Sequence, residues 1–197
     1  IQNLTVEVAI LHIGSLALTS GSDASVWEEF VGKAMDKGVK VSLDPNVRPS
    51  LIAEPDLYRQ RIKRLMTKVD ILKMSDEDLL WLFNDSVDES SALSELISIV
   101  NADIVILTQG SKGSLIWHYD NWYEAPAYPV GKLSDTVGAG DTFMASVLVW
   151  LTKNENLKRL SVIELEEKKD LQSYAGKAAS LNCEKQGCNP PWESELF

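Results

Sequence analysis

The sequence Asp135-Thr136-Val137-Gly138-Ala139-Gly140-Asp141-Thr142-Phe143 leads into an apolar run that predicts a helix over 139–152. The first turn of a helix presents free backbone N–H groups and the positive end of the helix dipole. Because small residues let an anion approach the backbone closely, Gly138, Ala139 and Gly140 are suited to hold a phosphoryl group. Asp141 would lie beside that anion, where a carboxylate can accept a proton from an attacking hydroxyl. The alternative is that Asp141 only favours the helix N-terminus and that the glycines only turn the chain.

On both sides of this segment, predicted strands and helices alternate. Apolar runs predict strands over 8–13, 39–43, 70–73 and 104–108, and a hairpin is predicted over 114–118 and 122–125 around Asp120-Asn121. Amphipathic patterns predict helices over 23–37, 55–67, 75–83, 89–100, 139–152, 157–165 and 168–184. Gly38 stands where a helix-ending glycine is expected, and Ser75 where an N-cap is expected. The alternation predicts one α/β domain over residues 1–197, with a mostly parallel sheet flanked by helices on both faces.

The composition is that of an acidic globular protein. Hydrophobic residues make up 45% of the chain, and 19 Lys and Arg against 29 Asp and Glu give a net charge of −10. This balance disfavours a nucleic-acid-binding protein, which needs clustered cations to neutralise phosphates. No run reaches 18 apolar residues, so no membrane span is predicted. Cys183 and Cys188 support neither a zinc site nor a disulfide framework, which favours a reduced, cytoplasmic protein.

Residues 135–143 resemble, without a gap, the C-terminal signature of the ribokinase-type (PfkB) carbohydrate kinases. The resemblance implies a ribokinase-like fold and the ATP-dependent phosphorylation of a sugar hydroxyl. It also implies that Asp141 is the catalytic base and that Gly138, Ala139 and Gly140 form the anion hole. The segment is not a Walker P-loop, because no G-x-x-x-x-G-K-[ST] occurs in the chain.

Two further segments resemble elements that hold the nucleotide in this family. The first, Thr108-Gln109-Gly110-Ser111-Lys112-Gly113, follows a predicted strand, and the resemblance implies that Thr108, Gly110, Ser111 and Gly113 bind ATP. The second, Lys73-Met74-Ser75-Asp76-Glu77-Asp78, resembles a K-x-[NS]-x-x-[ED] element, which implies that Ser75 and Asp78 help to order Mg²⁺-bound water. A plain turn and an ordinary helix N-cap followed by acids are the respective alternatives.

The residues that would bind the sugar and a monovalent cation are also assigned by resemblance. Asp44-Pro45-Asn46-Val47-Arg48-Pro49 resembles the D-x-N-x-R element of fructokinase-like and ketodeoxygluconate-kinase-like members, which implies that Asn46 and Arg48, with Asp141, contact the substrate. A surface arginine after a proline turn is the alternative. Residues 182–191 resemble the closing loop that binds K⁺ in several members. The implied ligands are Asp135 and the carbonyls of Val137, Lys185 and Gly187, with Asn182 assigned to the nucleotide site.

Together these segments predict a fructokinase-like enzyme that takes ATP and a small sugar as substrates, with Mg²⁺ and, as a further candidate, K⁺. Alternatives are a kinase for another sugar or a sugar acid such as 2-keto-3-deoxygluconate, and a catalytically inactive nucleotide-binding fragment. A dinucleotide-binding oxidoreductase is disfavoured, because no G-x-G-x-x-G follows the first predicted strand. The family's N-terminal sugar-binding elements and β lid are not found in these 197 residues, so we expect a truncated chain and, in the full-length enzyme, a homodimer.

Overall fold

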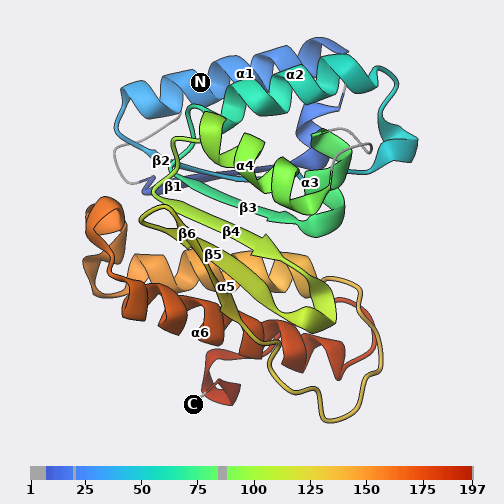
Figure 1. Ribbon diagram of the computed structural model, residues 1–197, viewed down its shortest axis with the longest axis vertical. Coiled ribbons are helices and arrows are strands. Elements are labelled where there is room, and N and C mark those ends of the chain that lie inside the picture. Colours follow the sequence, from blue (N-terminus) through green and yellow to red (C-terminus); the bar gives the residue numbers. More distant parts are fainter. Residues whose placement is uncertain (1–7, 20, 84–87, 197) are drawn as a thin grey trace. The chain divides into compact units, whose positions relative to one another are not determined.

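A computed structural model describes residues 8–19, 21–83 and 88–196 of the chain (Figure 1). The strands are β1 (Ile10–Gly14), β2 (Lys40–Asp44), β3 (Ile71–Ser75), β4 (Ile104–Thr108), β5 (Ser114–His118) and β6 (Asn121–Ala125). The α-helices are α1 (Gly21–Asp36), α2 (Pro55–Met66), α3 (Asp76–Leu82), α4 (Glu89–Ile99), α5 (Ala139–Thr152) and α6 (Leu165–Cys183). No helix in these ranges is long and apolar enough to cross a membrane.

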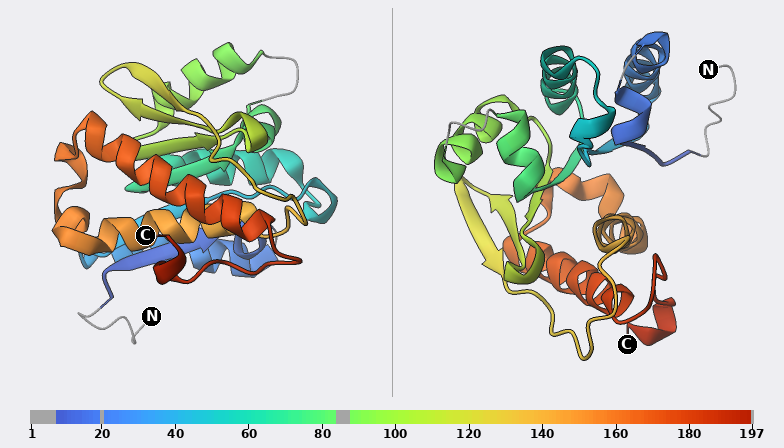
Figure 2. Two further views of the ribbon diagram at one scale, coloured as in Figure 1. Left: turned by 90° about the horizontal axis from the view of Figure 1, so that it is seen from below. Right: turned by 90° about the vertical axis from the view of Figure 1, so that its right-hand side faces the viewer.

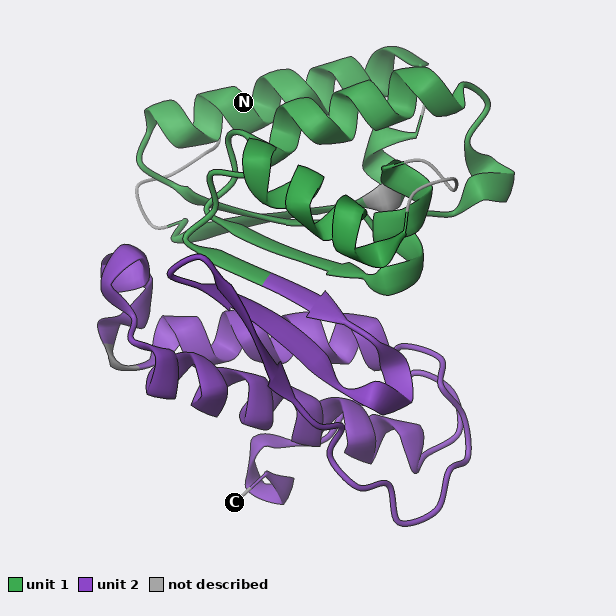
Figure 3. Ribbon diagram, in the orientation of Figure 1, with its two compact units in different colours: residues 1–105 green, residues 106–197 purple. Residues whose placement is uncertain are grey.

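The chain divides into two compact units, Ile1–Val105 and Ile106–Phe197, which we call unit 1 and unit 2 (Figure 3). The boundary falls within β4, so this strand begins in unit 1 and ends in unit 2. The strands follow one another in chain order in the sheet. That all 197 residues form one domain stays a prediction.

Unit 1 has the predicted strand–helix alternation. β1 pairs with β2, and β2 with β3, and both pairings are parallel. β2 and β3 are almost completely buried, because they lie inside the sheet, whereas β1 is mostly half-buried. α1 and α2 lie side by side (Figures 1 and 2). Their fully buried side chains include Val31, Ile62 and Leu65. A right-handed crossover between neighbouring parallel strands explains why the two helices share a face of the sheet.

Unit 2 combines an antiparallel hairpin with two long helices. β5 pairs with both β4 and β6 in antiparallel register. The tight turn between β5 and β6 is made by Tyr119 and Asp120, with φ of 42° and 61°. Positive φ at both positions gives the backbone twist that a two-residue hairpin needs. The predicted hairpin is confirmed, although its turn comes one residue earlier than expected. α5 and α6 pack against each other, and α6 lies along the hairpin (Figure 2).

Two predicted helices differ from the structure in type or by more than two residues at one end. The segment predicted as a helix over 157–165 is instead a 3-10 helical stretch, Lys153–Val162, in which Glu155 has a φ of 59°. α6 begins at Leu165 rather than at residue 168, because Glu164 is its N-cap. The N–H of Glu164 donates to Glu167 Oε2 at 3.0 Å, as in a capping box. Arg159 also pairs with both oxygens of Glu167, which holds the 3-10 stretch against the start of α6.

Gly38, predicted to end the first helix, has a φ of +74°. A Cβ at this position would meet no atom within 4 Å, so the replacement Gly38→Ala adds only the backbone strain of a left-handed alanine. We expect it to lower the free energy of unfolding by about 1–2 kcal/mol, as measured by urea denaturation.

Gly32 is the matched control, because it lies within α1 and also has open space around it. Gly32→Ala should raise the free energy of unfolding by about 0.4–1 kcal/mol, because alanine favours a helix and loses less entropy on folding. Equal effects of the two substitutions would contradict the role assigned to Gly38.

Candidate active site

The N-terminus of α5 has the backbone geometry that an anion site requires. Gly138 is the N-cap, with a φ of +76°, and its carbonyl accepts the N–H of Thr142 at 2.8 Å. The N–H groups of Gly140 and Asp141 lie in the first helical turn, where donors point away from the helix toward an approaching anion. Asp141 is exposed in that same turn. The four residues predicted to act on the phosphoryl group therefore lie together at the start of α5. They are Gly138, Ala139, Gly140 and Asp141.

Asp135 ties the segment before α5 to the closing loop. Its Oδ1 accepts the N–H of Val137 at 3.0 Å, and its Oδ2 accepts the N–H of Gly187 at 3.0 Å. These two backbone hydrogen bonds favour the charged carboxylate and lower the pKa of Asp135. Asn182, which is fully buried, makes a second link, since its Nδ2 donates to the Val137 carbonyl and its Oδ1 accepts the N–H of Asn189, both at 2.9 Å.

The predicted cation ligands are thus partly assembled within unit 2. The Asp135 oxygens accept the N–H groups of Val137 and Gly187, and the Val137 carbonyl accepts from Asn182 Nδ2, so these oxygens lie in one hydrogen-bonded group. Hard oxygens of this kind suit an alkali ion. Lys185 could contribute only its carbonyl, because its ammonium group is positively charged and has no lone pair; its Nζ is paired with Glu195 Oε1 at 3.0 Å. The amide of Asn182 shapes these loops, and its contact with a nucleotide stays a prediction.

The lowered pKa of Asp135 predicts a pH-dependent contribution to stability. Because its folded pKa lies below that of an unfolded aspartate, about 3.9, the contribution is present above that pH and is lost as the pH falls further. We expect Asp135→Asn to lower the urea midpoint at pH 6, and the gap to the parent protein to close below about pH 4. Asp170→Asn on the exposed face of α6 is the control. A gap that stays constant from pH 6 to pH 3 would contradict the assignment.

The loop predicted to hold ATP follows β4. The N–H of Gln109 donates to the Gly113 carbonyl at 2.8 Å, and a 3-10 turn, Gly110–Lys112, closes the loop. Gly113 has a φ of +109°, and a Cβ there would overlap the Ala125 carbonyl oxygen. Packing alone therefore explains why residue 113 is a glycine, which is also what a plain turn without a ligand would need. The binding of ATP by this loop stays a prediction. The loop also borders a pocket of about 450 Å³. The lining residues are Gln109, Lys112, Ser114, Glu124, Ala125 and Pro126.

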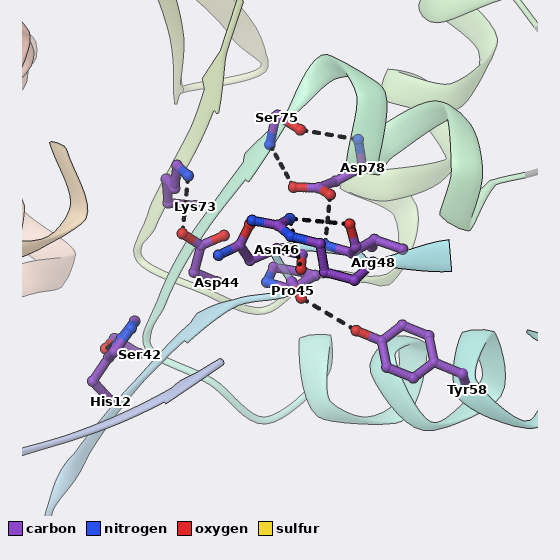
Figure 4. Close-up of polar contacts among 11 residues, drawn as sticks. His12, Ser42, Asp44, Pro45, Asn46, Arg48, Tyr58, Lys73, Ser75 and Asp78 are labelled. Atoms are coloured by element: carbon purple, nitrogen blue, oxygen red, sulfur yellow. Dashed lines mark hydrogen bonds and ion pairs between the residues drawn. The ribbon is translucent and has the colours of Figure 1, made fainter. Parts of the chain in front are cut away.

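In unit 1, Ser75 is the N-cap of α3, as predicted (Figure 4). Its Oγ accepts the N–H of Asp78 at 3.0 Å, and the Oδ2 of Asp78 accepts the N–H of Ser75 at 3.1 Å. This capping box confirms the helix-capping interpretation of the element. The ordering of Mg²⁺-bound water by Ser75 and Asp78 stays a prediction.

The loop after β2 carries the two residues predicted to contact the sugar. Asn46 adopts a φ of +41°, which is uncommon for a residue other than glycine. Arg48 is exposed, and its Nη1 donates to the carbonyls of Asn46 at 3.2 Å and Val47 at 3.1 Å. The remaining guanidinium donors can serve a ligand with oxygen acceptors.

Two supporting contacts of this loop were missed by the sequence analysis. Asp44 Oδ2 and Lys73 Nζ form a buried ion pair at 2.9 Å (Figure 4). Tyr58 Oη donates to the Pro45 carbonyl at 3.2 Å, and burial raises the pKa of Tyr58. The ion pair had a signal, since Asp44 and Lys73 lie near the ends of two successive strands of a sheet predicted to be mostly parallel. For the contact of Tyr58 there was no such signal, since the sequence predicted only that this residue lies in a helix over 55–67.

A model of the pfkB family of carbohydrate kinases matches residues 2–195 of the chain. The chain is 34% identical over 157 residues to a fructokinase from Rhizobium leguminosarum bv. trifolii, covering 80% of this chain and 47% of that one. It is 30% identical over 183 residues to fructokinase-2 from Zea mays, covering 92% and 52%. The chain therefore spans about half the length of these two curated relatives.

Solved structures are similar over nearly the whole chain. A fructokinase from Vibrio cholerae O395, crystallised with fructose, ADP and calcium, has a TM-score of 0.80 at 25% identity and covers 95% of this chain and 59% of that one. An uncharacterized sugar kinase from Pyrococcus horikoshii in complex with ATP has a TM-score of 0.75 at 26% identity, covering 96% and 56%. These similarities confirm the predicted α/β, ribokinase-like fold class.

Proposed function

The chain belongs to the pfkB family of carbohydrate kinases, and from that membership we propose that the protein phosphorylates a sugar hydroxyl with ATP, fructose being the favoured acceptor. The observation that supports this most directly is the turn from Gly138 to Asp141 at the start of α5. It combines a left-handed N-cap, backbone donors and a carboxylate within four residues.

In the proposed reaction, Asp141 accepts the proton of the attacking sugar hydroxyl. The N–H groups of the first turn of α5 stabilise the negative charge of the phosphoryl group during transfer. The side chain at position 138 must be absent, because the N-cap is left-handed and lies against Cys188. Mg²⁺, when bound, neutralises charge on the nucleotide phosphates. Ser75 and Asp78 are its proposed partners through water, and Asp135 with the Val137, Lys185 and Gly187 carbonyls would hold K⁺.

Fructose is favoured over other acceptors because both relatives named above are fructokinases. Asn46 and Arg48 are the proposed sugar contacts, and Thr108, Gly110, Ser111 and Gly113 the proposed ATP contacts. An arginine near the acceptor also suits a sugar acid, whose carboxylate it could bind with two parallel hydrogen bonds. We further propose action in the cytoplasm, and a homodimer for the full-length enzyme.

A coupled assay of ADP release tests the proposal on the intact protein. Fructose, ribose, glucose, 2-keto-3-deoxygluconate and a nucleoside would be compared at saturating ATP and Mg²⁺. We expect fructose to give the highest kcat/KM. If no acceptor gives sugar-dependent ADP release, the kinase activity is rejected. A preference for the sugar acid would reject fructose as the favoured acceptor and leave the kinase activity standing.

A further inference from the structure

Asp78 connects two segments that the proposed function assigns to different ligands. One carboxylate oxygen, Oδ2, accepts the N–H of Ser75 and completes the capping box of α3. The other, Oδ1, accepts the N–H of Val47 at 2.7 Å, across 31 residues of sequence (Figure 4). Val47 is the residue between Asn46 and Arg48, the two proposed sugar contacts. One side chain therefore joins the Ser75–Asp78 element to the loop after β2.

Helix capping alone does not require the second contact. A capping box uses one oxygen of the acid at the third helical position, and here that oxygen is Oδ2. The Oδ1 bond is short and charge-assisted, and the Asp78 side chain is buried, so the carboxylate and the Val47 N–H satisfy each other away from water. Loss of this acceptor would leave the loop amide without a partner in a buried setting.

The loop also needs support from outside itself. Asn46 has a φ of +41°, a conformation that costs free energy for a residue with a side chain, although less for asparagine than for most, so neighbouring contacts help to hold it. Two contacts flank this residue: Tyr58 Oη holds the Pro45 carbonyl on one side, and Asp78 holds the Val47 N–H on the other (Figure 4). Tyr58 lies on α2 and is fully buried. Among the contacts described, those of Tyr58 and Asp78 therefore hold the backbone on the two sides of Asn46.

We propose that Asp78 is a positioning residue for the acceptor, which sets the backbone of residues 46–48 and thereby the direction of the Asn46 and Arg48 side chains. This inference rests on the proposed function, since it takes those side chains as sugar contacts. It adds to the proposed ordering of Mg²⁺-bound water and has a different readout, because positioning of the loop acts on the KM for the sugar whereas the metal role acts on the Mg²⁺ dependence.

Asp78→Asn tests the inference on the intact protein. An asparagine offers one oxygen and one NH₂ group, so it cannot accept the N–H groups of Val47 and Ser75 together. We expect the KM for fructose to rise about tenfold or more, because the loop loses the acceptor of the Val47 N–H and no longer holds Asn46 and Arg48 in place. The KM for ATP should stay within about threefold of the parent value, because the proposed ATP contacts lie on another loop. Amide hydrogen exchange at Val47 should accelerate at least about tenfold.

Asp76→Asn is the matched control, because it removes the same charge from the same turn of α3 and Asp76 bonds only to the neighbouring Glu77 N–H among the contacts described. It should leave the KM for fructose and the exchange at Val47 unchanged.

An unchanged KM for fructose in Asp78→Asn, with an altered Mg²⁺ dependence, would overturn the inference in favour of the metal role. If the parent protein phosphorylates no sugar, the proposed function fails by itself. Amide exchange at Val47 then decides whether Asp78 holds the backbone of residues 46–48. If Val47 is as protected in Asp78→Asn as in the parent protein, this positioning role is rejected too.

Discussion

Asp141→Asn is expected to lower kcat for sugar phosphorylation by about 10²–10⁴-fold. The substitution keeps the size of the side chain and its place in the first turn of α5, but an amide cannot accept the proton of the attacking hydroxyl. Since the side chain is exposed, its loss should leave the fold intact. The affinity for ATP should change by less than about threefold, because the proposed nucleotide contacts lie on other segments.

The measurement is ADP release at saturating fructose and ATP, together with ATP binding by calorimetry. Asp170→Asn, which also removes an exposed carboxylate from a helix of unit 2, should retain the parent kcat. Full turnover by Asp141→Asn would reject its assignment as the base. A loss of ATP binding equal to the loss of turnover would show that Asp141 holds the nucleotide instead.

Features encoded over a few neighbouring residues were predictable from the sequence. The start of α5, the N-cap at Ser75 and the helix end at Gly38 were all confirmed, because caps and left-handed glycines act within one turn of chain. The errors are also local in kind. The charged stretch predicted as a helix over 157–165 is part of a 3-10 segment, Lys153–Val162. This segment contains Glu155 at a positive φ and is followed by α6, which begins earlier than expected.

Contacts that join distant loops were not predictable, in contrast to the Asp44–Lys73 ion pair between neighbouring strands. Nothing in the pattern of residues 73–78 indicates that the second oxygen of Asp78 reaches Val47, 31 positions earlier. The same is true of Asn182, whose amide links Val137 with Asn189 and which the resemblance assigned to the nucleotide. Such contacts depend on how loops meet after the sheet and helices have formed. They decide which polar residues can face a ligand, and sequence spacing does not encode them.

Gly138→Ala is expected to be the most damaging backbone change at this site. An alanine at a φ of +76° costs about 1–2 kcal/mol. A Cβ would also overlap Cys188 Sγ and lie 2.8 Å from Cys188 Cβ and 3.2 Å from its Cα, so the closing loop must move. Overpacking of this kind adds about 1–3 kcal/mol. Because the displaced segment presents the proposed anion-binding amides, kcat should fall by about 10²–10³-fold.

Two further variants separate the causes of this loss. Gly176→Ala within α6 meets no atom within 4 Å, so it should leave kcat unchanged and slightly raise the free energy of unfolding. Cys188→Gly, added to Gly138→Ala, removes the two closest overlapping atoms and leaves the left-handed strain. If this double variant regains stability but not kcat, the N–H geometry at Gly138 is what turnover requires. If it regains both, the overlap with the closing loop explains the loss. Parent-level kcat in Gly138→Ala alone would reject the anion hole, since the amides that define it could then be displaced without consequence.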